Sequence, residues 1–192
     1  MTTGLLRFNG TLTSADERRH FLELLSLRPD ARLLEADGGA VAGPDGSFDA
    51  VLCIDAIAGC SDRAGVLAEW VRVVKPSGRI LYTDPAIVAG LITSEEIATR
   101  SAMGFLVFSS QGVNEFLIEA AGLRLLRADD ATDTAALFAS RLHRERAGNV
   151  GALAATEGRE RYDTVQRYLE VAHRLGSERR LARIAFLAEK SP

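Results

Sequence analysis

Apolar residues follow two patterns along the chain, one typical of buried strands and one typical of amphipathic helices. Residues 49–55 (DAVLCID) and 79–83 (RILYT) are nearly continuous apolar runs, as in parallel strands that are covered on both faces. Between these runs, apolar positions from Leu67 to Val74 recur at helical spacing. The order strand, helix, strand predicts a right-handed βαβ unit and therefore an α/β fold.

Further elements are expected on both sides of this unit. Ser14 and Thr93 begin capping-box patterns, which predict the starts of two helices. Residues 131–178 have mostly helical patterns, and we interpret them as an insertion, or lid, before the last strand. Because no linker divides the chain, we expect a single domain over residues 1–192. The remaining predicted strands are 31–36, 123–127 and 184–189.

Composition and charge narrow the classes of function. The 192 residues are 47% hydrophobic and 26% charged, the balance of a globular domain. A net charge of −3 gives no general attraction for polyanions, so we expect no nucleic acid as a partner. No apolar run approaches the roughly 18 residues of a membrane span, and the first residues lack a secretory signal pattern. Cys53 and Cys60 cannot form a disulfide framework, so we expect reduced thiols and a cytoplasmic protein.

Three segments carry a resemblance to a known family. They are Phe48-Asp49 at the start of one strand, residues 72–78 (RVVKPSG) at the end of a helix, and residues 121–123 (AGL) before a later strand. Over about residues 45–127, the chain resembles the second half of the class I S-adenosylmethionine-dependent methyltransferases. The resemblance implies a Rossmann-like sheet, here reduced to about five strands, whose reversed last strand lies between the two before it. It also implies methyl transfer to a small organic molecule.

The family's cofactor-binding half has too little chain here. Residues 33–39 (LLEADGG) resemble the family's first strand and glycine-rich loop, but only residues 40–47 separate them from Phe48. Each missing βα unit needs about 30 residues. The resemblance implies S-adenosylmethionine as the cofactor, whereas this shortage leads us to expect weak binding or none. The residues that the resemblance assigns to the cofactor are Asp37, Gly38, Gly39, Asp55 and Ala56.

The short connection also leaves the position of residues 31–36 open. This segment lies antiparallel beside strand 49–55, extends another element, or joins the sheet of a second copy, because a parallel crossover usually contains a helix. In the first arrangement an apolar sheet edge is left unpaired. We therefore expect either a homodimer or an N-terminal helix that folds over this edge.

Ligands in open α/β sheets bind beyond the carboxyl ends of the strands. This rule selects Asp37, Asp55 and Asp84 at the ends of their strands, and Asp84-Pro85 is expected to end the strand 79–83. Asp55 would orient a substrate group or act as a base, or it would only cap the following turn. His143 would carry a proton if the insertion covers the strand ends, or would lie on a solvated helix face. No cluster has metal-ligand spacing. Residues expected to contact the substrate are Ile57, Tyr82, Asp84, Phe105, Phe108 and Tyr162.

Three functions remain open at this level. The first is S-adenosylmethionine-dependent methylation of a small molecule, which the resemblance implies. The second is an enzyme on the same scaffold that does not use the cofactor and promotes cyclisation, rearrangement or elimination of a natural-product-like substrate. The third is a non-catalytic, dimerising partner.

Overall fold

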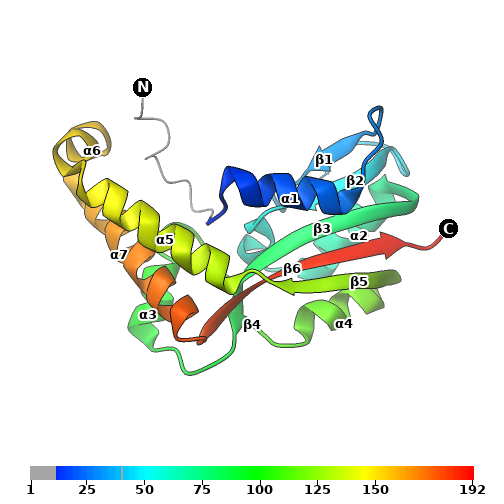
Figure 1. The fold of residues 1–192 in the computed structure, drawn as a ribbon. Helices are drawn as coiled ribbons and strands as arrows, with labels where there is room; N and C mark the ends of the chain where they lie inside the picture. The colour runs from blue at the N-terminus through cyan, green and yellow to red at the C-terminus, as the bar shows by residue number, and fades with distance from the viewer. Residues whose placement is uncertain (1–11, 40) are drawn as a thin grey trace.

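A twisted sheet forms the centre of the protein in a computed structural model, which describes residues 12–39 and 41–192 (Figure 1). The main path of the sheet runs β1-β2-β3-β6-β5, and the short strand β4 pairs with β3. Strand β6 is antiparallel to both of its neighbours, while β1, β2 and β3 are parallel. The predicted α/β fold and the place of the last strand are therefore confirmed. The strands are β1 Leu33–Glu35, β2 Phe48–Cys53, β3 Val74–Val88, β4 Ser109–Ser110, β5 Leu123–Asp130 and β6 Leu181–Lys190.

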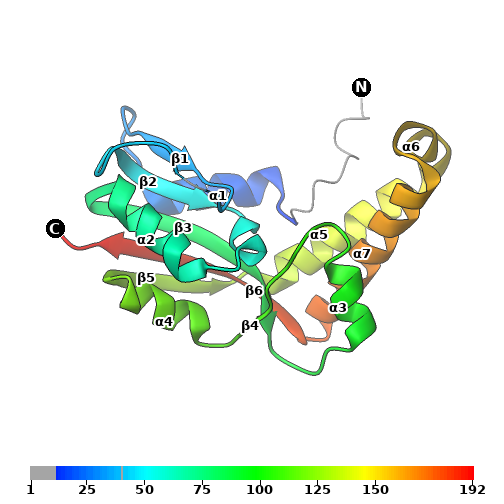
Figure 2. The same cartoon turned by 180° about the vertical axis from the view of Figure 1, so that it is seen from behind.

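Helices cover both faces of the sheet, which explains the nearly continuous apolar runs in its strands. Helix α1 (Ala15–Leu25) lies on one face, where Phe21 packs among residues of β2, β3 and β6. Helices α2 (Arg63–Val73) and α4 (Val113–Ala120) lie on the other face, where Trp70 belongs to the largest apolar cluster (Figure 2). The domain thus has three layers, with the sheet in the middle.

A second group of helices extends from the end of the sheet at which β3 and β5 finish (Figures 1 and 2). It has its own apolar core, which includes Leu142, Leu153 and Leu169. Most of residues 148–158 form the short helix α6 (Val150–Glu157). Three of these helices lie between β5 and β6, where the insertion was expected. The helices are α3 Ser94–Arg100, α5 Thr132–Ala147, α6 Val150–Glu157 and α7 Arg159–Ser177.

Strand β1 differs from every arrangement that the sequence suggested. It pairs parallel to β2, and residues 36–39 and 41–47 of the crossover contain no helix. Helix α1 lies on a face of the sheet and leaves the outer edge of β1 without a paired strand among the described residues. Three residues are short for an edge strand, and this limits the unpaired backbone. The homodimer stays a prediction.

The second difference concerns Asp84-Pro85, which was expected to end a strand. Strand β3 continues to Val88 through a bulge, where the register with β6 shifts between Asp84 and Ile87. A bulge accommodates proline because its nitrogen need not donate to the ladder. The Asp84 carboxylate accepts the Ala86 N–H at 3.0 Å and so supports the bulge.

We predict that Gly78→Ala destabilises the protein by about 1–3 kcal/mol, since a side chain there overpacks the start of β3. A Cβ on Gly78 would lie 2.8 Å from the Lys75 carbonyl oxygen and 2.9 Å from that of Asp49. Urea unfolding followed by circular dichroism measures the change. Gly151→Ala is the control, because it lies in α6 with open space around it and is expected to stabilise by about 0.5–1 kcal/mol. Equal stability of the two variants would contradict this account.

We also predict an acid-sensitive contact at Glu96, which joins α3 to the start of β6. Its carboxylate accepts hydrogen bonds from Arg180 at 2.7 Å and 2.9 Å and from the Thr93 N–H at 2.9 Å. The Arg180 hydrogen bonds are the main reason that the pKa of Glu96 falls from 4.5 to about 2. A lowered pKa gives stability that is full above pH 4.5 and is lost as the pH falls towards 2.

The stability difference between wild type and Glu96→Gln should therefore be largest at neutral pH and should shrink between pH 4.5 and about 2. Urea unfolding at a series of pH values measures this difference. Glu95→Gln, on an exposed neighbour, serves as the control and should show little change. A difference for Glu96→Gln that does not vary with pH would refute the role of its charge.

Candidate small-molecule site

A cavity of about 220 Å³ lies beyond the carboxyl end of β2. Its walls come from the end of β2, the short 3-10 helix η1 (Ala56–Gly59), the segment after α3, and α7. Most of the lining is apolar, and the charged residues among it are Asp55 and Arg100. An apolar cavity with a few placed polar groups, at the carboxyl ends of parallel strands, is typical of small-molecule sites.

Asp55 is held at the cavity by a fixed set of donors. Its carboxylate accepts from the Thr83 hydroxyl at 2.7 Å, from Arg183 Nε at 2.7 Å and from the Leu12 N–H at 3.2 Å. Its backbone has φ of 61°, in the left-handed region that non-glycine residues seldom adopt. Such strain is maintained only where the surroundings fix the residue, and it is common at functional sites.

Arg183 connects Asp55 to the N-terminal helix. Only 2% of Arg183 is exposed, and its guanidinium donates to Asp55, to Glu17 at 2.7 Å and to the Thr13 hydroxyl. Burial is the main reason that the pKa of Glu17 is raised, while Arg183 acts against this rise. The ion pairs of Arg183 with Asp55 and Glu17 fix α1 against the end of β2.

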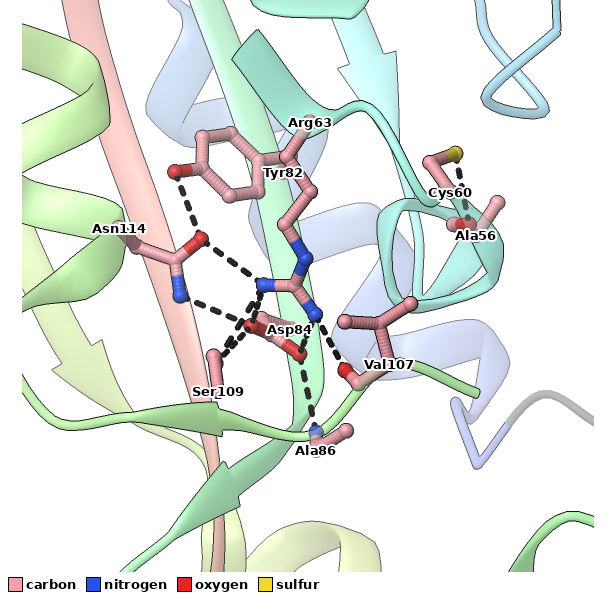
Figure 3. Close-up of polar contacts among 9 residues, drawn as sticks. All are labelled: Ala56, Cys60, Arg63, Tyr82, Asp84, Ala86, Val107, Ser109 and Asn114. Carbon is pink, nitrogen blue, oxygen red and sulfur yellow. Dashed lines mark hydrogen bonds and ion pairs between the residues drawn. The ribbon is translucent and has the colours of Figure 1, made fainter. Parts of the chain in front are cut away.

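A second buried network surrounds Asp84 (Figure 3). Arg63 forms an ion pair with the Asp84 carboxylate, which also accepts from Ser109 at 3.0 Å and from Asn114 at 2.8 Å. The Tyr82 hydroxyl donates to the Asn114 side-chain oxygen at 3.2 Å, and burial raises the pKa of Tyr82. Because these residues come from β3, α2, β4 and α4, the network fastens four elements together.

The structure brings only part of the predicted site together. Asp55, Ala56 and Phe105 line the cavity. The other predicted residues do not line it: Ile57, Tyr82 and Asp84 are buried in the sheet layer, Phe108 packs beside α7, Tyr162 lies in the helical core, and His143 is half-buried on α5.

The glycine loop predicted to hold the cofactor is closed against η1. Gly39 N–H donates to the Asp37 carboxylate at 2.9 Å, which makes a local turn. The Gly38 carbonyl accepts from the Cys60 thiol at 3.3 Å, and a Cβ on Gly38 would lie 2.5 Å from that sulfur. Cys60 therefore lies directly against Gly38, and none of the three loop residues lines the cavity.

These residues do not fit S-adenosylmethionine. Among the described residues, no strand pairs with the outer edge of β1. Family members place an acidic residue for the ribose and a contact for the adenine at the ends of the strands beyond that edge. The remaining candidate, the loop at Gly38, is closed by Cys60.

A larger, open cavity of about 430 Å³ lies at the opposite, amino ends of the strands. Its charged groups already pair with one another: Lys75 binds Asp49 at 2.9 Å, and Arg79 approaches Glu189 at 3.6 Å. Within residues 12–39 and 41–192, no cluster is suited to hold a metal ion. No helix in this part of the chain is long and apolar enough to cross a membrane. The cavity beyond β2 is therefore the best candidate site.

Sequence reasoning missed Arg100 and Met103 of the cavity wall, and it missed Arg183. The capping box at Thr93 predicted the helix that carries Arg100, but the residues that Arg100 contacts are distant in the sequence. The one available signal was the position of Arg100 in the last turn of a predicted helix, which is also a common place for an exposed basic residue.

Comparisons with known proteins agree with this fold. Residues 2–82 match the methyltransferase domain family. Methyltransferase GfsG of Streptomyces halstedii is 30% identical over an alignment of 136 residues, which covers 64% of this chain and 48% of the relative, so the chain spans about half the length of that protein.

Two solved structures share the fold at low sequence identity. The cyclopropane synthase MmaA2 of Mycobacterium tuberculosis superimposes with a TM-score of 0.78 and 14% identity, over 92% of this chain and 86% of that one. The [4+2]-cyclase SpnF gives a TM-score of 0.58 and 18% identity, over 81% and 54%. The chain is therefore similar to the methyltransferase domain family over residues 2–82, and it shares the fold of these solved structures.

Proposed function

We propose that this methyltransferase-fold protein is an enzyme that acts on a small organic molecule in the cavity beyond β2, without holding S-adenosylmethionine in its own chain. The closure of the loop at Gly38 by Cys60 carries this proposal, because it removes the space for the methyl donor. The cavity on the other side of η1 remains available for a substrate.

Without a methyl donor, the chemistry must come from the shape of the cavity and from its polar groups. Apolar walls at Met103, Phe105 and Leu106 suit a largely apolar substrate. Asp55 would accept a hydrogen bond from a substrate hydroxyl or amine and so fix its orientation. Cyclisation, rearrangement or elimination needs no further reactant. The similarity in fold to a [4+2]-cyclase supports this choice, because a fold can host several chemistries.

A second candidate is S-adenosylmethionine-dependent methyl transfer. The match of residues 2–82 to the methyltransferase domain family and the 30% identity to a curated methyltransferase favour it. In that case the methyl donor would need contacts that the loop at Gly38 does not offer. Direct measurement of donor binding distinguishes the two candidates.

Titration calorimetry of the purified protein with S-adenosylmethionine and with S-adenosylhomocysteine is expected to show no binding tighter than about 1 mM. The physical reason is the filled space between Gly38 and Cys60. A family member with a complete sheet, titrated in parallel, is the positive control. A micromolar dissociation constant with one site per chain would overturn the proposal and establish the second candidate.

Asp55→Ala is expected to lower the free energy of unfolding by about 3 kcal/mol, because buried Arg183 loses a charged partner. Urea unfolding of the variant measures this change. Asp37→Ala is the matched control, since Asp37 is exposed and its loss should cost less than about 0.5 kcal/mol. Unchanged stability of Asp55→Ala would show that the ion pair does not fix the strand end.

A further inference from the structure

Arg100 is a buried cation that has no charged partner among the residues that the structure describes. Only 2% of it is exposed, it ends α3, and it lines the cavity beyond β2. Its Nε and Nη1 atoms are buried and have no hydrogen-bond partner within residues 12–39 and 41–192. No carboxylate among the described residues forms an ion pair with it. An arginine cannot release its proton in a protein, so this charge persists in the cavity wall.

The other buried arginines show how unusual this is. Arg63 pairs with Asp84, Arg146 with Glu157, and Arg183 with both Asp55 and Glu17. Each of these charges is therefore neutralised where it is buried.

Arg100 has a weaker form of compensation. Its guanidinium carbon lies 4.5 Å from the centre of the Tyr168 ring, in a cation–π contact. Such a contact attracts the charge but leaves the N–H groups without acceptors. Burial of the guanidinium charge without hydrogen-bond acceptors is unfavourable, and a bound anion would offset this free-energy cost.

We propose that Arg100 binds the carboxylate of an acidic, otherwise apolar substrate in this cavity; the inference rests on the proposed function. A guanidinium presents its donors as a planar fork that matches a carboxylate. The negatively charged Asp55 lines the same cavity and repels anions in proportion to their charge. A singly charged carboxylate is therefore favoured over a doubly charged phosphate. The apolar lining around Phe105 would contact the rest of the substrate.

A structural role for Arg100 makes a different prediction. A small cavity of about 20 Å³ touches Arg100, Thr132 and Arg183, and it has room for about one water molecule. A water there would accept a hydrogen bond from Arg100 without neutralising its charge. In that case Arg100 would confer no preference between charged and neutral ligands.

The test compares 2-naphthoate with 2-naphthamide, which have nearly the same shape but differ in charge. Calorimetry with the full chain is expected to show at least tenfold tighter binding of the naphthoate. Arg100→Met should abolish this preference. Arg161→Met, on an exposed arginine of α7, is the matched control and should retain it. Equal binding of the two probes to the wild type, or a preference that survives Arg100→Met, would overturn the proposal.

Two further variants keep the test decisive. Arg100→Lys retains the charge but loses the fork, so the preference should fall at least threefold even if Arg100→Met does not fold. Phe105→Ser should weaken both probes, because Phe105 lines the cavity without carrying charge. Binding of naphthamide alone would refute the role of Arg100 while supporting a small-molecule cavity. Binding of neither probe would refute both proposals.

Discussion

The short connection between β1 and β2 is the constraint on which the rest of the structure depends. Residues 36–47 must carry the chain from the carboxyl end of β1 back to the amino end of the parallel strand β2. So short a crossover has no room for a further strand between β1 and β2, and among the described residues β1 is the edge of the sheet. The same segment places Gly38 against Cys60, while the end of β2 opens into the cavity.

Buried ion pairs hold the carboxyl ends of β2 and β3 in place. Arg183 reaches from β6 to Asp55 and Glu17, and Arg63 reaches from α2 to Asp84. Removal of charge from water is unfavourable unless both partners are well bonded, and these clusters supply several donors for each carboxylate. Each ion pair therefore adds little to the net stability, but it fixes the positions of the side chains that it joins. Asp55 shows this directly, since its three donors hold it at φ of 61°.

The sequence predicted well the elements in which buried positions recur at a regular spacing. It predicted poorly the contacts between residues that are distant in the sequence. Apolar runs predicted β2 and β3, because a strand that is buried on both faces is apolar throughout. Helical spacing of apolar residues predicted α2, because a helix that is buried on one face has apolar residues at that spacing. The rule that ligands bind at strand ends selected both Asp55 and Asp84, yet only Asp55 lines the cavity. Asp84 lies at a bulge inside a longer strand, and its partner Arg63 arrives from another element. No local pattern distinguishes such an aspartate from one at a site.

Arg100 lies outside the part of the fold that carries the family resemblance. The family resemblance concerns mainly the sheet, whereas Arg100 belongs to the helices that lie beyond the carboxyl ends of the strands. A fold can host several chemistries, because the sheet depends on its buried core and not on the groups around a ligand. The Tyr168 ring compensates the buried charge of Arg100 only in part, and an apolar side chain of similar size would pack there at lower cost. The proposed anionic ligand accounts for the rest of this compensation.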